Sequence, residues 1–91
     1  MASSPEPGGE PSLNPVVIYL RRDCHLCEVA LEVITKVRAD LPFMLQQIDI
    51  ESDDELFKRY LERIPVVTIA GREAFEYFVD ERSLIDKVRA R

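Results

Sequence analysis

Several protein classes need features that this sequence lacks. It has two cysteines among 91 residues, whereas small secreted scaffolds are held together by several disulfides. No stretch approaches the ~18 consecutive apolar residues of a membrane span. The first residues show neither the basic start and apolar run of a secretory signal nor the Arg-rich pattern of a transit peptide. We therefore expect a soluble, cytoplasmic protein that makes no contact with membranes.

Positive charge is also scarce, and it is spread along the chain. The formal net charge is −5, and leaving out the two carboxylates Glu6 and Glu10 makes it −3. Nucleic-acid binding depends largely on neutralising phosphates with clustered Lys and Arg. An acidic chain without a basic cluster therefore predicts no nucleic-acid partner.

The N-terminal stretch differs in composition from the rest. Residues 1–12, MASSPEPGGEPS, hold no large apolar side chain apart from Met1. Such a segment buries too little surface to offset the entropy lost on ordering, so we predict a disordered tail, either native or an added linker. Residues 13–91 then form one domain.

The predicted domain alternates strand-like and helix-like segments. Val16–Leu20 is a continuous apolar run, which fits a strand buried on both faces. From Cys24, apolar residues recur every three or four positions until Pro42, which predicts a helix with Asp23 as its N-cap. The later segments expected, in chain order, are a strand over 43–50, a short helix opened by a Ser52–Glu55 capping box, strands over 66–70 and 73–78 joined by a Gly71-Arg72 turn, and a last helix capped by Asp80.

This order of elements, β-α-β-α-β-β-α, predicts an α/β fold. Two strands joined by a long helix are parallel neighbours with a right-handed crossover, and a short turn makes the last two strands antiparallel. The result is a four-stranded mixed sheet with helices on both faces. The segment "DCHLC", residues 23–27, then lies at the carboxyl edge of the first strand, a usual location for a site in α/β proteins.

The placement of the cysteines favours redox chemistry. A thiolate at a helix N-terminus is stabilised by unpaired N–H groups and the helix dipole, and Cys24 is expected there. Cys27 aligns with the buried stripe of the helix and is expected to be more shielded. Residues at i and i+3 need a small adjustment to form a disulfide. We therefore expect Cys24 to attack a substrate disulfide and Cys27 to resolve the mixed disulfide.

Charged neighbours act on Cys24 in both directions. Arg21 and Arg22 favour its thiolate, and His25 does so when protonated, whereas Asp23 and Glu28 oppose ionisation. Two interpretations of His25, a tuning residue or a solvated first-turn residue, stay open.

A second element of the expected site is Ile64-Pro65, at the start of the third strand. Proline cannot donate to a strand ladder, so it marks a special backbone position. It is either an ordinary trans proline or a cis proline that directs the backbone of Ile64 toward an extended thiol substrate.

The CxxC after the first strand, together with "IP" opening the third, resembles the glutaredoxins of the thioredoxin-like fold over residues 16–90. More narrowly, "CHLCE" and "RIPVV" are similar to a small glutaredoxin-like family found largely in bacteria. The resemblance implies that Cys24 is the nucleophile and Cys27 the resolving cysteine. It also implies that Pro65 is the cis-proline and that Ile64 supplies substrate-binding backbone groups.

The same resemblance implies two glutathione contacts. Arg21 stands where glutaredoxins often have a Lys that helps bind glutathione, and Asp80 roughly matches the region that holds the γ-glutamyl end. The chain departs from the family at His25-Leu26 between the cysteines, at Arg63, and at residues 75–78, FEYF, where a Gly-Gly pair is usual. The electron donor therefore stays open between glutathione, a reductase and another donor.

The function expected is that of a thiol-disulfide oxidoreductase, which reduces protein or low-molecular-weight disulfides in electron transport and cell redox homeostasis. We expect the protein to have no bound cofactor, with glutathione at most a co-substrate. One alternative is metal or iron–sulfur binding, which needs a dimer because Cys24, His25 and Cys27 supply three ligands and structural zinc takes four. Another is a non-catalytic binding module with a redox-sensitive CxxC, for which Phe75, Tyr77 and Phe78 are candidate contacts. We expect these aromatics to be core residues instead.

Overall fold

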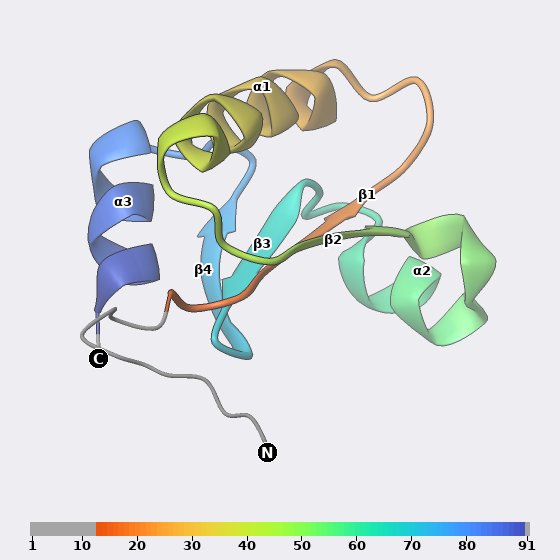
Figure 1. Cartoon of the computed structure of the whole chain (residues 1–91). Coiled ribbons are helices and arrows are strands. Elements are labelled where there is room, and N and C mark those ends of the chain that lie inside the picture. Colours follow the sequence, from red (N-terminus) through yellow and green to blue (C-terminus); the bar gives the residue numbers. More distant parts are fainter. Residues whose placement is uncertain (1–12, 91) are drawn as a thin grey trace.

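The structure, a computed structural model, describes residues 13–90 (Figure 1). The predicted tail over 1–12 and the last residue, 91, lie outside the described residues. The elements in chain order are β1 (Val16–Leu20), α1 (His25–Asp40), β2 (Leu45–Asp49), the 3₁₀ helix η1 (Ile50–Ser52), α2 (Asp54–Tyr60), β3 (Val66–Ile69), β4 (Arg72–Glu76) and α3 (Glu81–Arg89). The predicted β-α-β-α-β-β-α order is confirmed, with η1 as an additional turn before α2.

The four strands form one mixed sheet in the order β2-β1-β3-β4. β1 pairs parallel with β2, and β3 pairs antiparallel with both β1 and β4. β1 has both edges paired, and Val16 and Ile18 are buried under α1 and α3, whereas Val17 and Tyr19 on the other face are only partly buried, so the predicted burial on both faces is incomplete.

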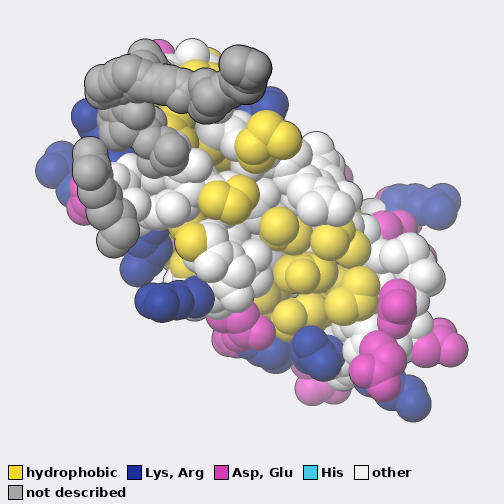
Figure 2. All heavy atoms as spheres, turned by 60° about the horizontal axis from the view of Figure 1, so that its bottom comes forward, with side chains coloured by type: hydrophobic (Ala, Val, Ile, Leu, Met, Phe, Trp, Pro, Cys, Tyr) yellow, Lys and Arg dark blue, Asp and Glu magenta, His cyan; other side chains and the backbone are white. Residues whose placement is uncertain are grey.

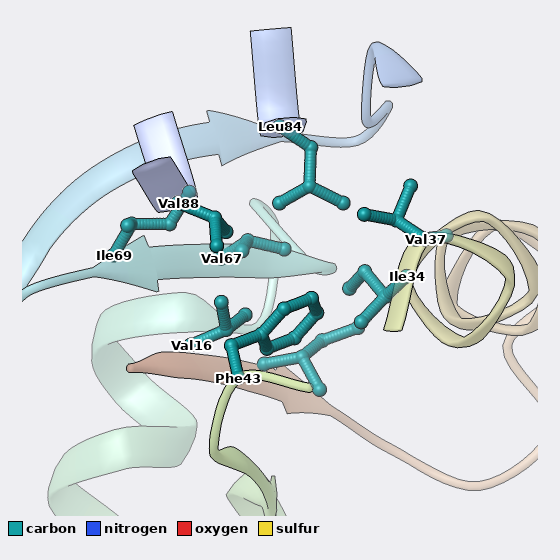
Figure 3. Packing of buried hydrophobic residues seen from close by; sticks show 10 residues of the cluster. Val16, Ile34, Val37, Phe43, Val67, Ile69, Leu84 and Val88 are labelled. Atoms are coloured by element: carbon teal, nitrogen blue, oxygen red, sulfur yellow. The ribbon is translucent and has the colours of Figure 1, made fainter. Parts of the chain in front are cut away.

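One face of the sheet carries the main hydrophobic core, under α1 and α3 (Figure 3). Alternate residues of a strand point to the same face, so Val16 and Ile18 lie on this side together with Val67 and Ile69. The buried residues of this cluster are Val16, Ile18, Ala30, Ile34, Val37, Phe43, Val67, Ile69, Leu84 and Val88. This packing fixes the direction of α1 across the sheet and therefore the position of its N-terminus.

On the other face, η1 and α2 pack against only the end of the sheet where β1 and β2 finish (Figure 1). Tyr19 and Val66 point to this side, and the ring of Tyr19 stacks on Tyr60 with centroids 4.6 Å apart. Figure 2 shows hydrophobic side chains gathered in the middle of the side that lies at the bottom of Figure 1, with charged side chains mainly around them. A second, smaller core joins α1 and α2 through Cys27, Ile50, Tyr60, Ile64 and Val66.

The hairpin between β3 and β4 turns one residue earlier than predicted. Ile69 pairs with Arg72, so Ala70 and Gly71 form the two-residue loop rather than Gly71 and Arg72. Both have positive φ, 55° and 81°, as in a type I′ turn, whose twist matches that of the strands. The prediction went wrong because alanine rarely takes this conformation.

The capping box predicted for α2 is also wrong. Asp53 is the N-cap, and its carboxylate accepts hydrogen bonds from the N–H groups of Glu55 and Leu56, at 2.8 and 3.3 Å. The hydroxyl of Ser52 instead donates to the carbonyl of Asp49, because η1 intervenes between β2 and α2. β2 accordingly ends at Asp49 and is shorter than the predicted strand over 43–50.

Candidate active site

The CxxC pair lies at the junction between β1 and α1, where the chain turns sharply. Asp23 has φ of 59°, and Cys24 follows in an extended conformation as the N-cap of α1. The prediction of Asp23 as the N-cap is therefore wrong, because the left-handed turn at this residue moves the cap one position on. The N–H of Cys27 donates to Sγ of Cys24 at 3.2 Å, so this sulfur accepts from one of the unpaired N–H groups of the helix.

Cys24 and Cys27 form a disulfide, with their Cα atoms 5.2 Å apart. Their surroundings differ. Cys24 is half-buried, whereas Cys27 is 3% exposed and packs among Ile50, Tyr60 and Ile64. The expected difference in exposure is confirmed. Cys24 is thus the more accessible of the two cysteines, while Cys27 lies in an apolar environment.

Cys24 borders an open hollow of about 670 Å³. The residues that line it are Arg21, Arg22, Asp23, Cys24, Glu51 and Ile64. The structure thus brings Ile64 beside the CxxC pair from 40 positions away in the sequence. It does not place Asp80 among the residues lining this hollow.

The Ile64–Pro65 peptide bond is cis. The carbonyl of Pro65 accepts a hydrogen bond from the N–H of Tyr77 at 2.9 Å, which joins the start of β3 to the end of β4. Within the described residues, Ile64 forms no loop or turn hydrogen bond through its backbone. The N–H and C=O groups of Ile64 are therefore left without a backbone partner in this part of the structure.

Arg21 is paired within the hollow. Its Nη2 atom lies 2.6 Å from Oε2 of Glu51, and its guanidinium stacks over the ring of Phe57 at 5.6 Å. Its Nε atom is buried and has no hydrogen-bond partner among residues 13–90. Glu51 thus compensates the positive charge that the sequence placed near Cys24. Arg22 is exposed and lines the same hollow.

His25 points to solvent. Its side chain is 84% exposed, and Nδ1 lies 3.9 Å from Oε1 of Glu28, one helical turn away. This geometry agrees with the interpretation of His25 as a solvated first-turn residue.

Asp80 is the N-cap of α3, as predicted. Its carboxylate accepts a hydrogen bond from the N–H of Ser83 at 2.9 Å. This backbone hydrogen bond, together with the side chain of Ser83, lowers the pKa of Asp80 below its usual value of 3.8, because both stabilise the charged form.

A charge cluster that the sequence analysis did not identify holds the segment before Ile64. Arg63 forms ion pairs with Glu73 and Glu76 of β4, and its guanidinium lies 5.3 Å from the ring centre of Tyr60. Hydrogen bonds to Glu76 and Glu73 raise the pKa of Arg63 above its usual value, because they stabilise the charged guanidinium. These contacts fix the entry into β3. Glu73 and Glu76 could have been predicted as partners of Arg63 only if the register of the β3–β4 hairpin had been known.

The prediction that the aromatics after β3 are core residues is wrong for two of the three. Phe75 is half-buried and packs against the main core, but Tyr77 is 40% exposed and Phe78 is 68% exposed. The reason is local: β4 ends at Glu76, and Tyr77 has φ of 67°, so the strand alternation is broken before it. Glu51 was also missed, although it follows β2 at the same sheet edge as Arg21.

Two absences hold for residues 13–90. No group of three or more His, Cys, Asp or Glu side chains there has the arrangement of a metal site. No helix in this part of the chain is long and apolar enough to cross a membrane.

Comparison with protein families gives one match, over residues 15–89, to the family described as glutaredoxin-like domain (DUF836). The chain belongs to this glutaredoxin-like family. Comparison with curated protein sequences gives no significant match.

Solved structures extend this relationship. The solution structure of protein Ne2328 from Nitrosomonas europaea matches with a TM-score of 0.72 and 26% identity, covering 97% of this chain and 99% of that one. The X-ray structure of protein XcR50 from X. campestris matches with a TM-score of 0.64 and 32% identity, over 78% of this chain and 95% of that one. Fasciola hepatica thioredoxin, at 17% identity, a TM-score of 0.58, and 85% and 79% coverage, shares the fold alone. The glutaredoxin-like chain thus has a thioredoxin-like fold with a CxxC disulfide.

Proposed function

We propose that the protein is a thiol-disulfide oxidoreductase that reduces protein or low-molecular-weight disulfides. The observation that carries this proposal is the asymmetry of the Cys24–Cys27 disulfide. One sulfur is accessible and accepts a hydrogen bond at a helix N-terminus, and the other is buried behind it. This arrangement suits a nucleophile and a resolving thiol.

The reaction starts from the dithiol form. The Cys24 thiolate attacks one sulfur of a substrate disulfide, forms a mixed disulfide and releases the first substrate thiol. The Cys27 thiolate then attacks Sγ of Cys24, forms the internal disulfide and releases the second thiol. Two electrons and two protons pass to the substrate, and the protein is left in the disulfide form described above.

The residues around Cys24 take up binding and tuning roles. The N–H and C=O groups of Ile64, next to the cis Pro65, pair with an extended stretch of substrate beside Cys24. Arg22, which is exposed in the hollow, is the cation available to a carboxylate of the substrate, because Arg21 is already paired with Glu51. Asp80 holds the start of α3, and His25 remains in solvent.

The internal disulfide is returned to the dithiol by an external thiol. Glutathione, acting as a co-substrate and not as a bound cofactor, or the dithiol of a reductase supplies these two electrons. We place the reaction in the cytoplasm, where the thiol pool keeps most cysteines reduced.

The test is to equilibrate the protein in glutathione buffers of graded potential, quench with acid, alkylate free thiols and measure intact masses. A two-electron transition between dithiol and internal disulfide, absent from Cys24→Ser and Cys27→Ala, supports the proposal. A transition at a potential between about −270 and −120 mV lies in the range of this superfamily. If neither thiol reacts over the whole range, the proposal is wrong.

Steady-state turnover separates catalysis from a redox-sensitive latch. Wild-type protein should reduce bis(2-hydroxyethyl) disulfide for many cycles when a thiol reductant is present, and Cys24→Ser should not. Oxidation without turnover would contradict the enzymatic part of the proposal.

A further inference from the structure

The ion pair between Arg21 and Glu51 lies where two neighbouring strands end, beside Cys24. Leu20 of β1 pairs with Asp49 of β2. Arg21 and Glu51 follow these strand ends closely, so they leave the sheet at the same edge. Both line the hollow that Cys24 borders, and their side chains are 37% and 38% exposed. Glu51 takes no part in the reaction proposed above, although its carboxylate shares this hollow with the reactive sulfur.

The backbone of Glu51 and the side chain of Arg21 are both held in place. Glu51 belongs to η1, where its N–H donates to the carboxylate of Asp49 at 2.8 Å. The preceding residue, Ile50, is fully buried and anchors this turn. On the other side, the guanidinium of Arg21 lies over the ring of Phe57 at 5.6 Å. Because its members are already ordered in part, this pair loses less entropy than two free surface side chains would lose.

The contact uses the part of Arg21 that a substrate carboxylate would need. A guanidinium binds a carboxylate most firmly through two parallel N–H bonds, and both possible pairs of nitrogens include Nη2. Nη2 already lies 2.6 Å from Oε2 of Glu51, and Nε is buried without a partner among residues 13–90. A second carboxylate would have to share Nη2 with Glu51 and would be repelled by its charge. Glu51 therefore occupies Arg21 as an anion site.

The other charges around Cys24 nearly cancel. Arg22 and Asp23 line the same hollow, both are exposed, and neither forms an ion pair among residues 13–90. Arg22 can meet a substrate carboxylate, but this contact is screened by water and offset by the adjacent Asp23. On α1, His25 and Glu28 are 84% and 70% exposed and lie next to each other. The ion pair described above therefore decides whether the hollow is neutral or charged.

We propose that Glu51 is a specificity-determining residue. By holding Arg21 and balancing its charge, Glu51 keeps the hollow close to neutral, so that Cys24 does not favour disulfides that carry a carboxylate near the sulfur. This inference rests on the proposed function and narrows its substrate class to disulfides that are uncharged beside the sulfur. Glu51 acts through Arg21 and does not touch the reacting atoms.

The experiment measures how fast three small disulfides of similar size oxidise the reduced full-length protein. Dithiodiglycolate is anionic, bis(2-hydroxyethyl) disulfide is neutral and cystamine is cationic. In each case Cys24 and Cys27 form the internal disulfide and two small thiols are released; acid quenching, alkylation and intact masses give the rate. Each rate is divided by that for the neutral disulfide, so that a change in the ionisation of Cys24 cancels. Dithiothreitol, an uncharged dithiol, supplies the reference ratios, and the wild-type ratio for dithiodiglycolate should not exceed its value.

Two single variants and their combination assign the effect. Glu51→Gln removes the charge and keeps an oxygen that can accept from Arg21. It should raise the ratio for dithiodiglycolate about fivefold, the upper end for a partly exposed charge pair, and lower the ratio for cystamine. Arg21→Met should do the opposite, and the double variant should return both ratios to within twofold of wild type. Damage to the fold would not be repaired by a second substitution.

The matched control is Glu55→Gln. Glu55 is exposed at the start of α2 and does not line the hollow, so the same change of net charge is made away from Arg21. This variant should leave both ratios within twofold of wild type.

Four outcomes would overturn the inference. They are a wild-type protein that favours dithiodiglycolate more than dithiothreitol does, an unchanged ratio in Glu51→Gln, equal shifts in Glu51→Gln and Glu55→Gln, or a double variant that stays away from the wild-type ratios. If none of the three disulfides oxidises the wild-type protein, the proposed function itself is wrong. The neutral disulfide therefore distinguishes failure of the chemistry from failure of the charge selection.

Discussion

Replacing Cys24 or Cys27 by serine should have different effects on the stability of the reduced protein: only the change at Cys27 should lower it. Sγ of Cys24 is the N-cap acceptor for the N–H of Cys27, at 3.2 Å. Serine is among the preferred N-cap residues, so Cys24→Ser should leave the free energy of unfolding equal to that of the reduced wild type or slightly above it. Cys27 is 3% exposed among apolar side chains, so Cys27→Ser places a hydroxyl where no apolar neighbour can accept its hydrogen bond.

The magnitude for Cys27→Ser follows from burial. An unsatisfied buried hydroxyl costs about 1–3 kcal/mol. In Cys27→Ala a sulfur is removed and no polar group is added, so the loss should be smaller, about 1 kcal/mol. The alanine variant is therefore the better protein for trapping a mixed disulfide on Cys24.

The assay is urea unfolding. It is followed by circular dichroism, because the chain has no tryptophan for fluorescence. A phosphine reductant is present throughout to keep the cysteines reduced. Reduced wild type, Cys24→Ser, Cys27→Ser and Cys27→Ala are compared, with equal slopes as the check that unfolding exposes similar surface. If Cys27→Ser is as stable as the reduced wild type, Cys27 is not in a dry environment and the division between an accessible and a shielded thiol is wrong. If Cys24→Ser loses more than about 1 kcal/mol, Cys24 does not cap α1.

Three further predictions concern the fold that positions the site. Ala70→Asn should raise the free energy of unfolding by roughly 1 kcal/mol, because asparagine tolerates the φ of 55° better than alanine, and an unchanged urea midpoint would contradict this. Asp80→Ala should lower the thermal midpoint above pH 3.8. The difference from wild type should vanish as the pH falls and the wild-type carboxylate, whose pKa is lowered by its bonds to Ser83, becomes protonated. A difference that persists in acid would argue against the cap. Ile34→Ala, at a fully buried position of α1, should cost about 2–5 kcal/mol in urea unfolding, and a loss below 1 kcal/mol would mean that the core closes around the cavity.

Local patterns in the sequence were enough for the elements and their order. The apolar run at β1, the spacing of apolar residues in α1 and the cap at Asp80 all depend on neighbours within a few positions. Patterns of this kind report the local backbone directly. The likeness of the CxxC and the Pro65 segment to glutaredoxins then indicated the thioredoxin-like fold.

Local patterns failed where a residue adopts a conformation against its preference. Asp23, Ala70 and Tyr77 all have positive φ, and each shifted a predicted boundary: the cap of α1, the hairpin turn and the end of β4. The surrounding structure holds these residues there, as the hydrogen bond from Tyr77 to Pro65 illustrates.

The sequence by itself determined the order of elements, the pair Cys24 and Cys27 at the start of a helix, and which of the two is more shielded. These follow from the period of the hydrophobic pattern. The tertiary structure alone decided that Glu51 neutralises Arg21, that Arg63 is held by Glu73 and Glu76, and that Phe78 lies exposed at the edge carrying Pro65. Each depends on which strands are neighbours and in what register, and the free energy of those pairings comes from contacts between residues far apart in the chain.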